Sequence, residues 1–412
     1  MKSDFLKTAG MDELIAEAVR LKESGRIVSD IYDDEGNQYV DLVQEGGGML
    51  GIALTGYTYI LEQAGIRFYS LAGTSAGSIN TLLMAALAKP GEVSSLKILD
   101  IVSNKNFFDF VDGPSGLKRL IQRKIENKKG VWWYLLVNLK ILYDSIRLKL
   151  GINPGKHFED WLSDILKQNS IENLRDLNTL RKDIPRLFHR LDPDYRITPP
   201  KMAIITSEIT THTKVDFPEM APLYWRDPEN ICPSRFIRAS MSIPFFFYPY
   251  EVQKMPNAGK HDEQWEKLAS YTGKVPETVR FVDGGMLSNF PINTFHVNRI
   301  PTRPTFGVRL STYRENYSNN THRLTGFCGA LISTMRQIHD YEFILKNTDY
   351  KHLICCINAD EEFNWLNFGM KPERQQQLFF LGAKRGLDFI KNFDWEGYKK
   401  IRASMVEAEK VT

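Results

Sequence analysis

The sequence is poor in cysteine, in long apolar runs and in net charge. It has four cysteines among 412 residues, and none forms a C-x-x-C pair or a metal-ligand spacing with histidine. This argues against a disulfide framework and favours a reducing compartment. No stretch reaches 18 apolar residues, so the sequence predicts no membrane-spanning helix. The formal net charge of +3 is too close to zero to indicate nucleic-acid binding.

Targeting and cofactor signals are also missing. Residues 1–23 are charged throughout and have no apolar core or small-residue cleavage site, so we expect no secretory signal and a cytoplasmic location. The eight histidines form no H-E-x-x-H or other close metal pair, and there is no D-x-D-x-D-G calcium loop. We therefore expect no metal and no other cofactor.

The most informative motif that is present is a G-x-S-x-G element at residues 73–77. It stands between an apolar run at 67–72 and a helical pattern at 78–88. The small residues Gly73 and Gly77 permit a sharp turn from strand to helix, which exposes the hydroxyl of Ser75. The helix that follows directs free N–H groups and its positive dipole end toward the substrate of that hydroxyl. The pattern predicts a nucleophile elbow.

A second glycine-rich element precedes the elbow. Gly46, Gly47 and Gly48 follow an apolar strand pattern at 39–43 and precede a helical pattern at 52–64. Consecutive glycines allow backbone N–H groups to converge on one point. A P-loop is excluded because lysine and serine or threonine are missing after this loop, and a dinucleotide loop lacks its acidic ribose ligand. An oxyanion hole fits the pattern better.

The third element is Asp283-Gly284-Gly285, at the end of a short strand pattern. Asp-Gly is a common turn dipeptide, so by itself this element indicates a turn at least as well as a catalytic carboxylate.

In combination, these motifs resemble the patatin-like phospholipase family. Three blocks carry the resemblance: residues 44–88, the segment 238–249, which is similar to the family's A-S-x-x-x-P-x-x-F-x-P pattern, and residues 283–285. The resemblance implies hydrolysis of acyl esters in membrane glycerophospholipids, of the phospholipase A type, without a cofactor.

The resemblance also implies a role for each motif. Ser75 would be the nucleophile and Asp283 the general base of a Ser-Asp dyad without histidine. The oxyanion hole would come from Gly46, Gly47 and Gly48. One position departs from the family, because Leu50 stands where the glycine loop usually has arginine or lysine. An arginine at position 50 would restore the usual cation, unless Leu50 packs in an apolar pocket.

The alternation of strand and helix patterns predicts an α/β fold, a three-layer α/β/α arrangement with a mostly parallel sheet. We expect an N-terminal helical extension at 1–37, a patatin-like phospholipase domain at 38–393, and a C-terminal tail at 394–412. A helical cap would be inserted at about 89–200, because the sheet does not need this segment.

The cap contains a basic and aromatic stretch, Lys118–Leu150. It holds nine cations against two acids and includes Trp132-Trp133-Tyr134 within a helical pattern at 131–143. Such a segment suits peripheral binding to an anionic membrane surface. A helix buried against the core with a solvated basic face explains the same pattern, and the sequence leaves both interpretations open.

Three alternatives for function remain at this stage. His296 follows Asp283 in the Ser–Asp–His order of α/β-hydrolases, so a Ser-His-Asp esterase is one of them. Hydrolysis of smaller soluble esters or thioesters is another. The third is a weakly active lipid-binding effector of membranes, suggested by Leu50.

Overall fold

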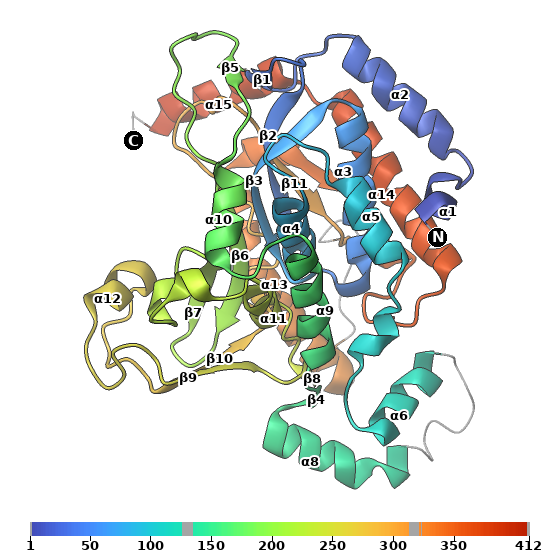
Figure 1. Ribbon diagram of the computed structural model, residues 1–412, viewed down its shortest axis with the longest axis vertical. Helices are drawn as coiled ribbons and strands as arrows, with labels where there is room; N and C mark the ends of the chain where they lie inside the picture. The colour runs from blue at the N-terminus through green and yellow to red at the C-terminus, as the bar shows by residue number, and fades with distance from the viewer. Residues whose placement is uncertain (1, 126–134, 313–320, 323, 410–412) are drawn as a thin grey trace.

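The computed structural model describes residues 2–125, 135–312, 321–322 and 324–409, and its centre is a ten-stranded sheet (Figure 1). The main strand order is β12-β11-β2-β3-β6-β10-β9, with β1, β5 and β7 at its sides. These strands are β1 (Ile31–Asp33), β2 (Gln38–Gln44), β3 (Ile66–Thr74), β5 (Leu187–His189), β6 (Met202–Glu208), β7 (Thr213–Phe217), β9 (Tyr250–Gln253), β10 (Thr278–Val282), β11 (Thr305–Arg309) and β12 (Ile354–Cys356). A separate pair joins β4 (Gly151–Asn153) to β8 (Phe245–Phe247).

The centre of the sheet is parallel and one side is antiparallel. β12, β11, β2, β3 and β6 run parallel to one another, whereas β10 pairs antiparallel with both β6 and β9. Val282 at the end of β10 lies opposite Ser207 near the end of β6. The residue after β10 therefore arrives at the edge where the central strands end. The predicted α/β fold with a mostly parallel sheet is confirmed.

Helices flank this sheet (Figure 1). They are α1 (Lys2–Leu6), α2 (Met11–Glu23), α3 (Ile52–Gln63), α4 (Ala76–Leu87), α5 (Ser95–Ser103), α6 (Ser115–Ile125), α8 (Leu139–Lys149), α9 (Lys156–Gln168), α10 (Leu174–Lys182), α11 (Ser234–Ser240), α12 (Glu263–Ala269), α13 (Leu324–Lys346), α14 (Pro372–Asn392) and α15 (Trp395–Glu409). Short 3₁₀ turns include η1 (Gly48–Gly51), η2 (Phe107–Phe110), η5 (Gly284–Met286) and η6 (Thr348–Leu353).

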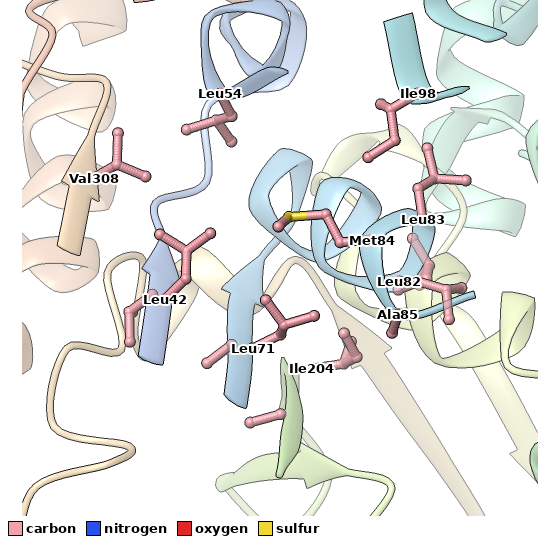
Figure 2. Close-up of a cluster of buried hydrophobic side chains, with 14 of the residues drawn as sticks. Leu42, Leu54, Leu71, Leu82, Leu83, Met84, Ala85, Ile98, Ile204 and Val308 are labelled. Carbon is pink, nitrogen blue, oxygen red and sulfur yellow. The ribbon is translucent and has the colours of Figure 1, made fainter. Parts of the chain in front are cut away.

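The core forms where α3 and α4 cover the parallel strands and α5 packs against both helices. Figure 2 shows Leu42 and Leu71 from the sheet facing Leu82 and Met84 of α4, with Ile98 of α5 behind them. α3 and α4 are buried along almost their whole length. This explains why their sequences are apolar all round rather than amphipathic. A rigid α4 in turn fixes the residue at its N-terminus.

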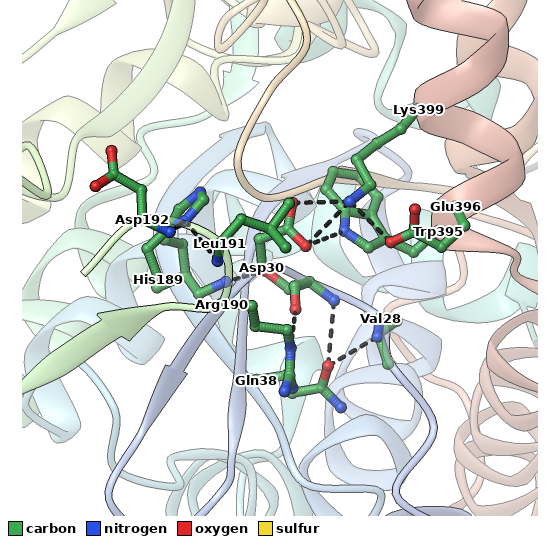
Figure 3. Close-up of polar contacts among 12 residues, drawn as sticks. Val28, Asp30, Gln38, His189, Arg190, Leu191, Asp192, Trp395, Glu396 and Lys399 are labelled. Atoms are coloured by element: carbon green, nitrogen blue, oxygen red, sulfur yellow. Dashed lines mark hydrogen bonds and ion pairs between the residues drawn. The ribbon is translucent and has the colours of Figure 1, made fainter. Parts of the chain in front are cut away.

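The C-terminal segment is structured. Within residues 394–412, which we expected to be a tail, helix α15 buries Trp395 and docks on the start of the chain. Figure 3 shows the anchor: Lys399 Nζ and Trp395 Nε1 both lie about 3 Å from the Asp30 carboxylate, at 3.1 and 3.0 Å. The extension at the other end, 1–37, contains α1, α2 and β1.

The segment 89–200 is only in part a cap. α5 packs against α3 and α4, and β5 pairs with β1 in the main sheet. By contrast, α6 and α8 lie together at the lower end of Figure 1, away from the sheet. Residues 126–134 lie outside the described residues, and with them Trp132-Trp133-Tyr134. Residues 139–149 form α8, which packs against β4 and leaves most of its apolar side chains exposed.

Candidate active site

Ser75 occupies a strained turn between β3 and α4. Its φ angle is +50°, a value that residues with a Cβ seldom adopt, and it directly precedes the first residue of α4. The flanking glycines make this turn possible. A Cβ on Gly73 would lie 2.4 Å from the Gly77 carbonyl carbon, and a Cβ on Gly77 would lie 2.3 Å from the Gln44 carbonyl oxygen. The elbow is thus pressed against the end of β2.

Asp283 is the first residue after β10 and faces this turn. Its carboxylate lies within hydrogen-bonding range of the Ser75 hydroxyl and accepts a 2.8 Å bond from the Gly285 amide. Burial raises the pKa of Asp283, while the positive charge of Arg336 and the hydrogen bonds from Ser75 and Gly285 lower it again. The structure therefore brings together a serine hydroxyl and a buried carboxylate with an elevated pKa.

The second sequence block holds both partners in place. The Ser75 amide donates to the Ser240 hydroxyl at 2.9 Å, and the Asp283 amide donates to the Ser242 carbonyl at 2.8 Å. Arg238, which is 4 % exposed, donates to the Ser242 hydroxyl at 2.6 Å. The turn after α11 thus sets the position of Ser75 relative to Asp283.

The glycine loop passes beside the nucleophile. A Cβ on Gly46 would lie 3.1 Å from the Ser75 Cβ, so a larger residue would separate the loop from the elbow. The Gly46 amide donates to the Asn289 carbonyl at 3.0 Å and is therefore occupied. The hydrogen bonds of the described residues include none from the amides of Gly47 or Gly48. Gly48 has a φ of +53°, which favours glycine.

Leu50 packs in the core and is 2 % exposed. It closes η1, with its amide donating to the Gly47 carbonyl at 3.0 Å. Its side chain packs in the core cluster and also borders the larger cavity that Gly47 and Arg336 line. An arginine at position 50 would therefore have to leave the core to be solvated. A cation reaches this region from α13 instead: Arg336 donates to the Asn289 side chain at 2.8 Å.

Two cavities meet at the glycine loop. An apolar cavity of about 70 Å³ starts at Ser75 and is lined by Ile79, Phe110, Phe158, Trp161 and Phe368, among others. A polar cavity of about 730 Å³ lies on the other side of the loop and is lined by Gly47, Asn289, Arg336, Asp360 and Glu361, among others. Ser75 lines the apolar cavity, and Gly46 and Gly47 beside it line the polar one.

Comparison with known proteins identifies the family. The family model for patatin-like phospholipase matches residues 42–296, which include Ser75, Asp283 and all three sequence blocks. The chain belongs to the patatin-like phospholipase family. It is accordingly a hydrolase of the patatin-like type, a class of lipid acyl hydrolases.

The similar proteins include a bacterial sequence and a solved structure. The uncharacterized protein YqhO of Bacillus subtilis (strain 168) is 30 % identical over 359 residues, which are 87 % of this chain and 100 % of YqhO. The crystal structure of VipD from Legionella pneumophila is similar over 89 % of this chain and 70 % of its own, with 14 % identity and a TM-score of 0.41.

His296 lies elsewhere in this patatin-like chain. Its ring nitrogens are hydrogen-bonded with the Tyr350 hydroxyl at 2.9 Å and with the Asn298 side chain at 2.8 Å. It lines a third cavity, of about 280 Å³, whose lining residues include neither Ser75 nor Asp283. This geometry gives no support to a triad through His296.

Sequence reasoning missed the residues that support the site. Ser240 and Ser242 lie in a block that we had quoted only for its resemblance, so a signal for them was present. Asn289 and Arg336 lie in segments with no recognisable motif, and only the fold brings them to the glycine loop.

The part of the chain that the structure describes holds no metal-binding cluster and no membrane-spanning helix. Within residues 2–125, 135–312, 321–322 and 324–409, no three His, Cys, Asp or Glu side chains are grouped so that they could hold a metal ion. In the same part of the chain, no helix has the length and apolarity needed to cross a bilayer.

Proposed function

We propose that Ser75 and Asp283 form a catalytic dyad that hydrolyses acyl esters of membrane glycerophospholipids. The observation that carries the proposal is the placement of the Ser75 hydroxyl, on a strained turn at the start of α4, against the buried Asp283 carboxylate. Family membership supports acyl ester hydrolysis, and the adjoining cavities favour an amphipathic substrate.

The first half-reaction forms an acyl-enzyme. The Ser75 oxygen attacks the ester carbonyl while its proton passes to Asp283, and the resulting oxyanion is held by the Gly47 and Gly48 amides and the dipole of α4. Gly46 allows the loop to lie close to Ser75 but does not donate to the oxyanion, because its amide donates to the Asn289 carbonyl. The tetrahedral intermediate then expels the lysophospholipid alkoxide, which takes the proton from Asp283.

The second half-reaction releases the fatty acid. Asp283, again ionised, accepts a proton from water as that water attacks the acyl ester of Ser75. The second tetrahedral intermediate expels the Ser75 alkoxide, which recovers the proton from Asp283. Because the pKa of Asp283 is raised, it lies closer to the pH at which the enzyme works. A carboxylate with such a pKa is a better general base and general acid.

The two cavities suggest the orientation of the substrate. In our proposal the acyl chain enters the apolar cavity, whose aromatic wall includes Phe110 and Phe158, with ring centroids 5.2 Å apart. The glycerol and head group then face the polar cavity beyond the glycine loop. The glycine loop, which lies between the two, meets the ester carbonyl.

We further propose that α6 and α8 contact the membrane surface. Leu136, Val137 and Leu148 are 63 %, 64 % and 71 % exposed, although they are large apolar residues. Leu148 lies on α8 beside the exposed cations Lys140, Arg147 and Lys149, and Leu136 and Val137 lie just before this helix. Exposed apolar side chains beside cations suit insertion at an anionic lipid interface.

The proposal is tested by incubating the protein with mixed phospholipid vesicles and following the lipids by mass spectrometry. We expect lysophospholipids and free fatty acids in equal amounts, and neither product with Ser75→Ala. Release of soluble thiols or short acids from small thioesters or esters, without any phospholipid turnover, would favour the smaller-substrate alternative instead.

A further inference from the structure

We infer that Arg336 on α13 is a positioning residue of this site: it orients the Asn289 amide that closes the glycine loop and supplies the positive charge facing Asp283. The inference rests on the proposed function of Ser75 and Asp283. It concerns a residue outside the matched family region, which ends at residue 296.

The first line of support is a chain of hydrogen bonds from α13 to the glycine loop. Arg336 Nη2 donates to Asn289 Oδ1 at 2.8 Å. Asn289 Nδ2 in turn donates to the Gly46 carbonyl and to Glu45 Oε1, each at 3.2 Å. Because a guanidinium can only donate, it fixes which end of the Asn289 amide faces the loop.

The second line of support is electrostatic. Gly285 keeps the space between Arg336 and Asp283 free of a side chain: a Cβ there would lie 3.1 Å from Arg336 Nε and 2.7 Å from Asp283 Oδ1. Among the charged groups that the structure describes, Arg336 is the one that lowers the pKa of Asp283 against the effect of burial. It therefore keeps more of the base ionised at a given pH.

Other titratable groups face the same region. Asp340, one turn after Arg336 on α13, accepts bonds from the Ser288 hydroxyl and the Phe290 amide, both at 2.7 Å, and burial raises its pKa to about 7. Glu45 accepts from the Ser311 amide at 3.0 Å. Any pH effect of Arg336 must therefore be separated from the titration of Asp340.

Leu50 explains why the cation has to come from α13. The glycine-loop position at which the family usually has a basic residue is filled here by a buried leucine. Arg336 reaches the loop from the other side, stacked over Trp365 at 5.7 Å, while the Trp365 carbonyl accepts from the Met49 amide at 2.9 Å. Arg336, through Asn289, thus holds the chain at Gly46, and Trp365 holds it at Met49.

The experiment measures kcat/KM on a short soluble ester as a function of pH, with thermal melts alongside. For Arg336→Gln we expect kcat/KM to fall about 10²-fold at neutral pH, the size of the loss when a catalytic group is misplaced. We also expect the acidic limb of the pH profile to move to higher pH. Arg336→Lys keeps the charge and should leave the limb near its wild-type position. Arg374→Gln is the matched control, because Arg374 stacks over Phe363 at 4.1 Å near the same cavity.

An acidic limb of Arg336→Gln that coincides with the wild-type limb would overturn the inference, whatever the change in rate or melting temperature. If Arg336→Gln does not fold, the test is the pH profile of kcat/KM of Arg336→Lys in an Asp340→Asn background. We expect the acidic limb of this profile to remain at the wild-type position. An acidic limb displaced as far as that of an uncharged variant such as Arg336→Met overturns the inference. Failure of the proposed function looks different, since Ser75→Ala would then retain wild-type activity.

Discussion

The amide of Ser75 donates a 2.9 Å hydrogen bond to the hydroxyl of Ser240, which itself donates to the Ile205 carbonyl at 2.5 Å. The strained elbow is thereby tied to β6, the strand beside which Asp283 also arrives. The two reacting groups share one support, although 208 residues separate them in sequence. A change in this support moves both groups relative to each other, so the site depends on residues that never contact substrate.

Removal of either member of the dyad should abolish hydrolysis. We expect Ser75→Ala and Asp283→Asn each to lower kcat by about 10⁴-fold or more, since both groups take part in the first chemical step. The double variant should be no slower than the slower single variant. The check is hydrolysis of phospholipid vesicles and of a short ester, with circular dichroism to confirm folding. Substantial activity of Ser75→Ala would contradict the mechanism.

Asp283→Asn should also stabilise the protein at neutral pH. The pKa of Asp283 is raised in the folded state, so its stabilising contribution is complete below the unfolded pKa and is lost as pH rises through the folded pKa. Above that range wild type carries a buried charge that asparagine lacks. Thermal melts from pH 4 to pH 8 should show the difference in Tm widening with pH. A constant difference would mean that Asp283 is not the titrating group.

The activity itself should fall in acid at a higher pH than an exposed aspartate would cause. Asp283 must be ionised to accept the Ser75 proton, and burial raises its pKa. The pH profile of kcat/KM on a soluble ester measures this limb. Asp340→Asn is the control, because the pKa of Asp340 is about 7 and its carboxylate holds the neighbouring turn. A limb that disappears in Asp340→Asn would assign it to Asp340.

His296→Ala should retain most of the esterase activity. The imidazole is hydrogen-bonded with Tyr350 and Asn298 in a separate cavity. Its loss should therefore lower Tm while leaving kcat close to the wild-type value. Steady-state kinetics at a temperature below the Tm measured for the variant separates the two effects. A loss of about three orders of magnitude in the folded variant, the scale for removal of a triad base, would restore the Ser-His-Asp alternative.

Leu50→Arg should destabilise the fold by roughly 3 kcal/mol or more, because it places an unpaired charge at a site that is 2 % exposed in wild type. Leu50→Met, which conserves volume, should cost less than about 1.5 kcal/mol. Urea denaturation of both variants measures this difference. An arginine variant with wild-type stability and a higher rate would show that the side chain reaches the polar cavity and acts there.

The exposed basic helices should bind anionic vesicles. Reversal of Arg119, Lys124 and Lys149 to glutamate should weaken binding and vesicle hydrolysis while sparing a short soluble ester, since each cation near an anionic surface contributes on the order of 1 kcal/mol at best. The matched control reverses three exposed cations around α12: Lys260, Lys267 and Lys274. Vesicle flotation at two salt concentrations makes the measurement. Equal losses in both triple variants would count against a docking role for α6 and α8.

Local pattern alone determined the elements on which the site is built. The elbow, the glycine loop and the strand before Asp283 could be predicted because each depends on residues adjacent in sequence. Gly73 and Gly77 permit the turn, and consecutive apolar residues form the buried parallel strands β2 and β3. The family followed from the order of these motifs, and the sheet and the family model agree with it.

Tertiary structure alone decided how these elements meet. The antiparallel pairing of β10 with β6 places Asp283 beside Ser75, and α13 brings Arg336, through Asn289, to Gly46, which lies 290 residues before it. It also left α8 exposed and moved His296 into a different cavity. These outcomes depend on hydrogen bonds and packing between distant segments. No periodicity or spacing records such contacts, because their energy exists only once the sheet has assembled.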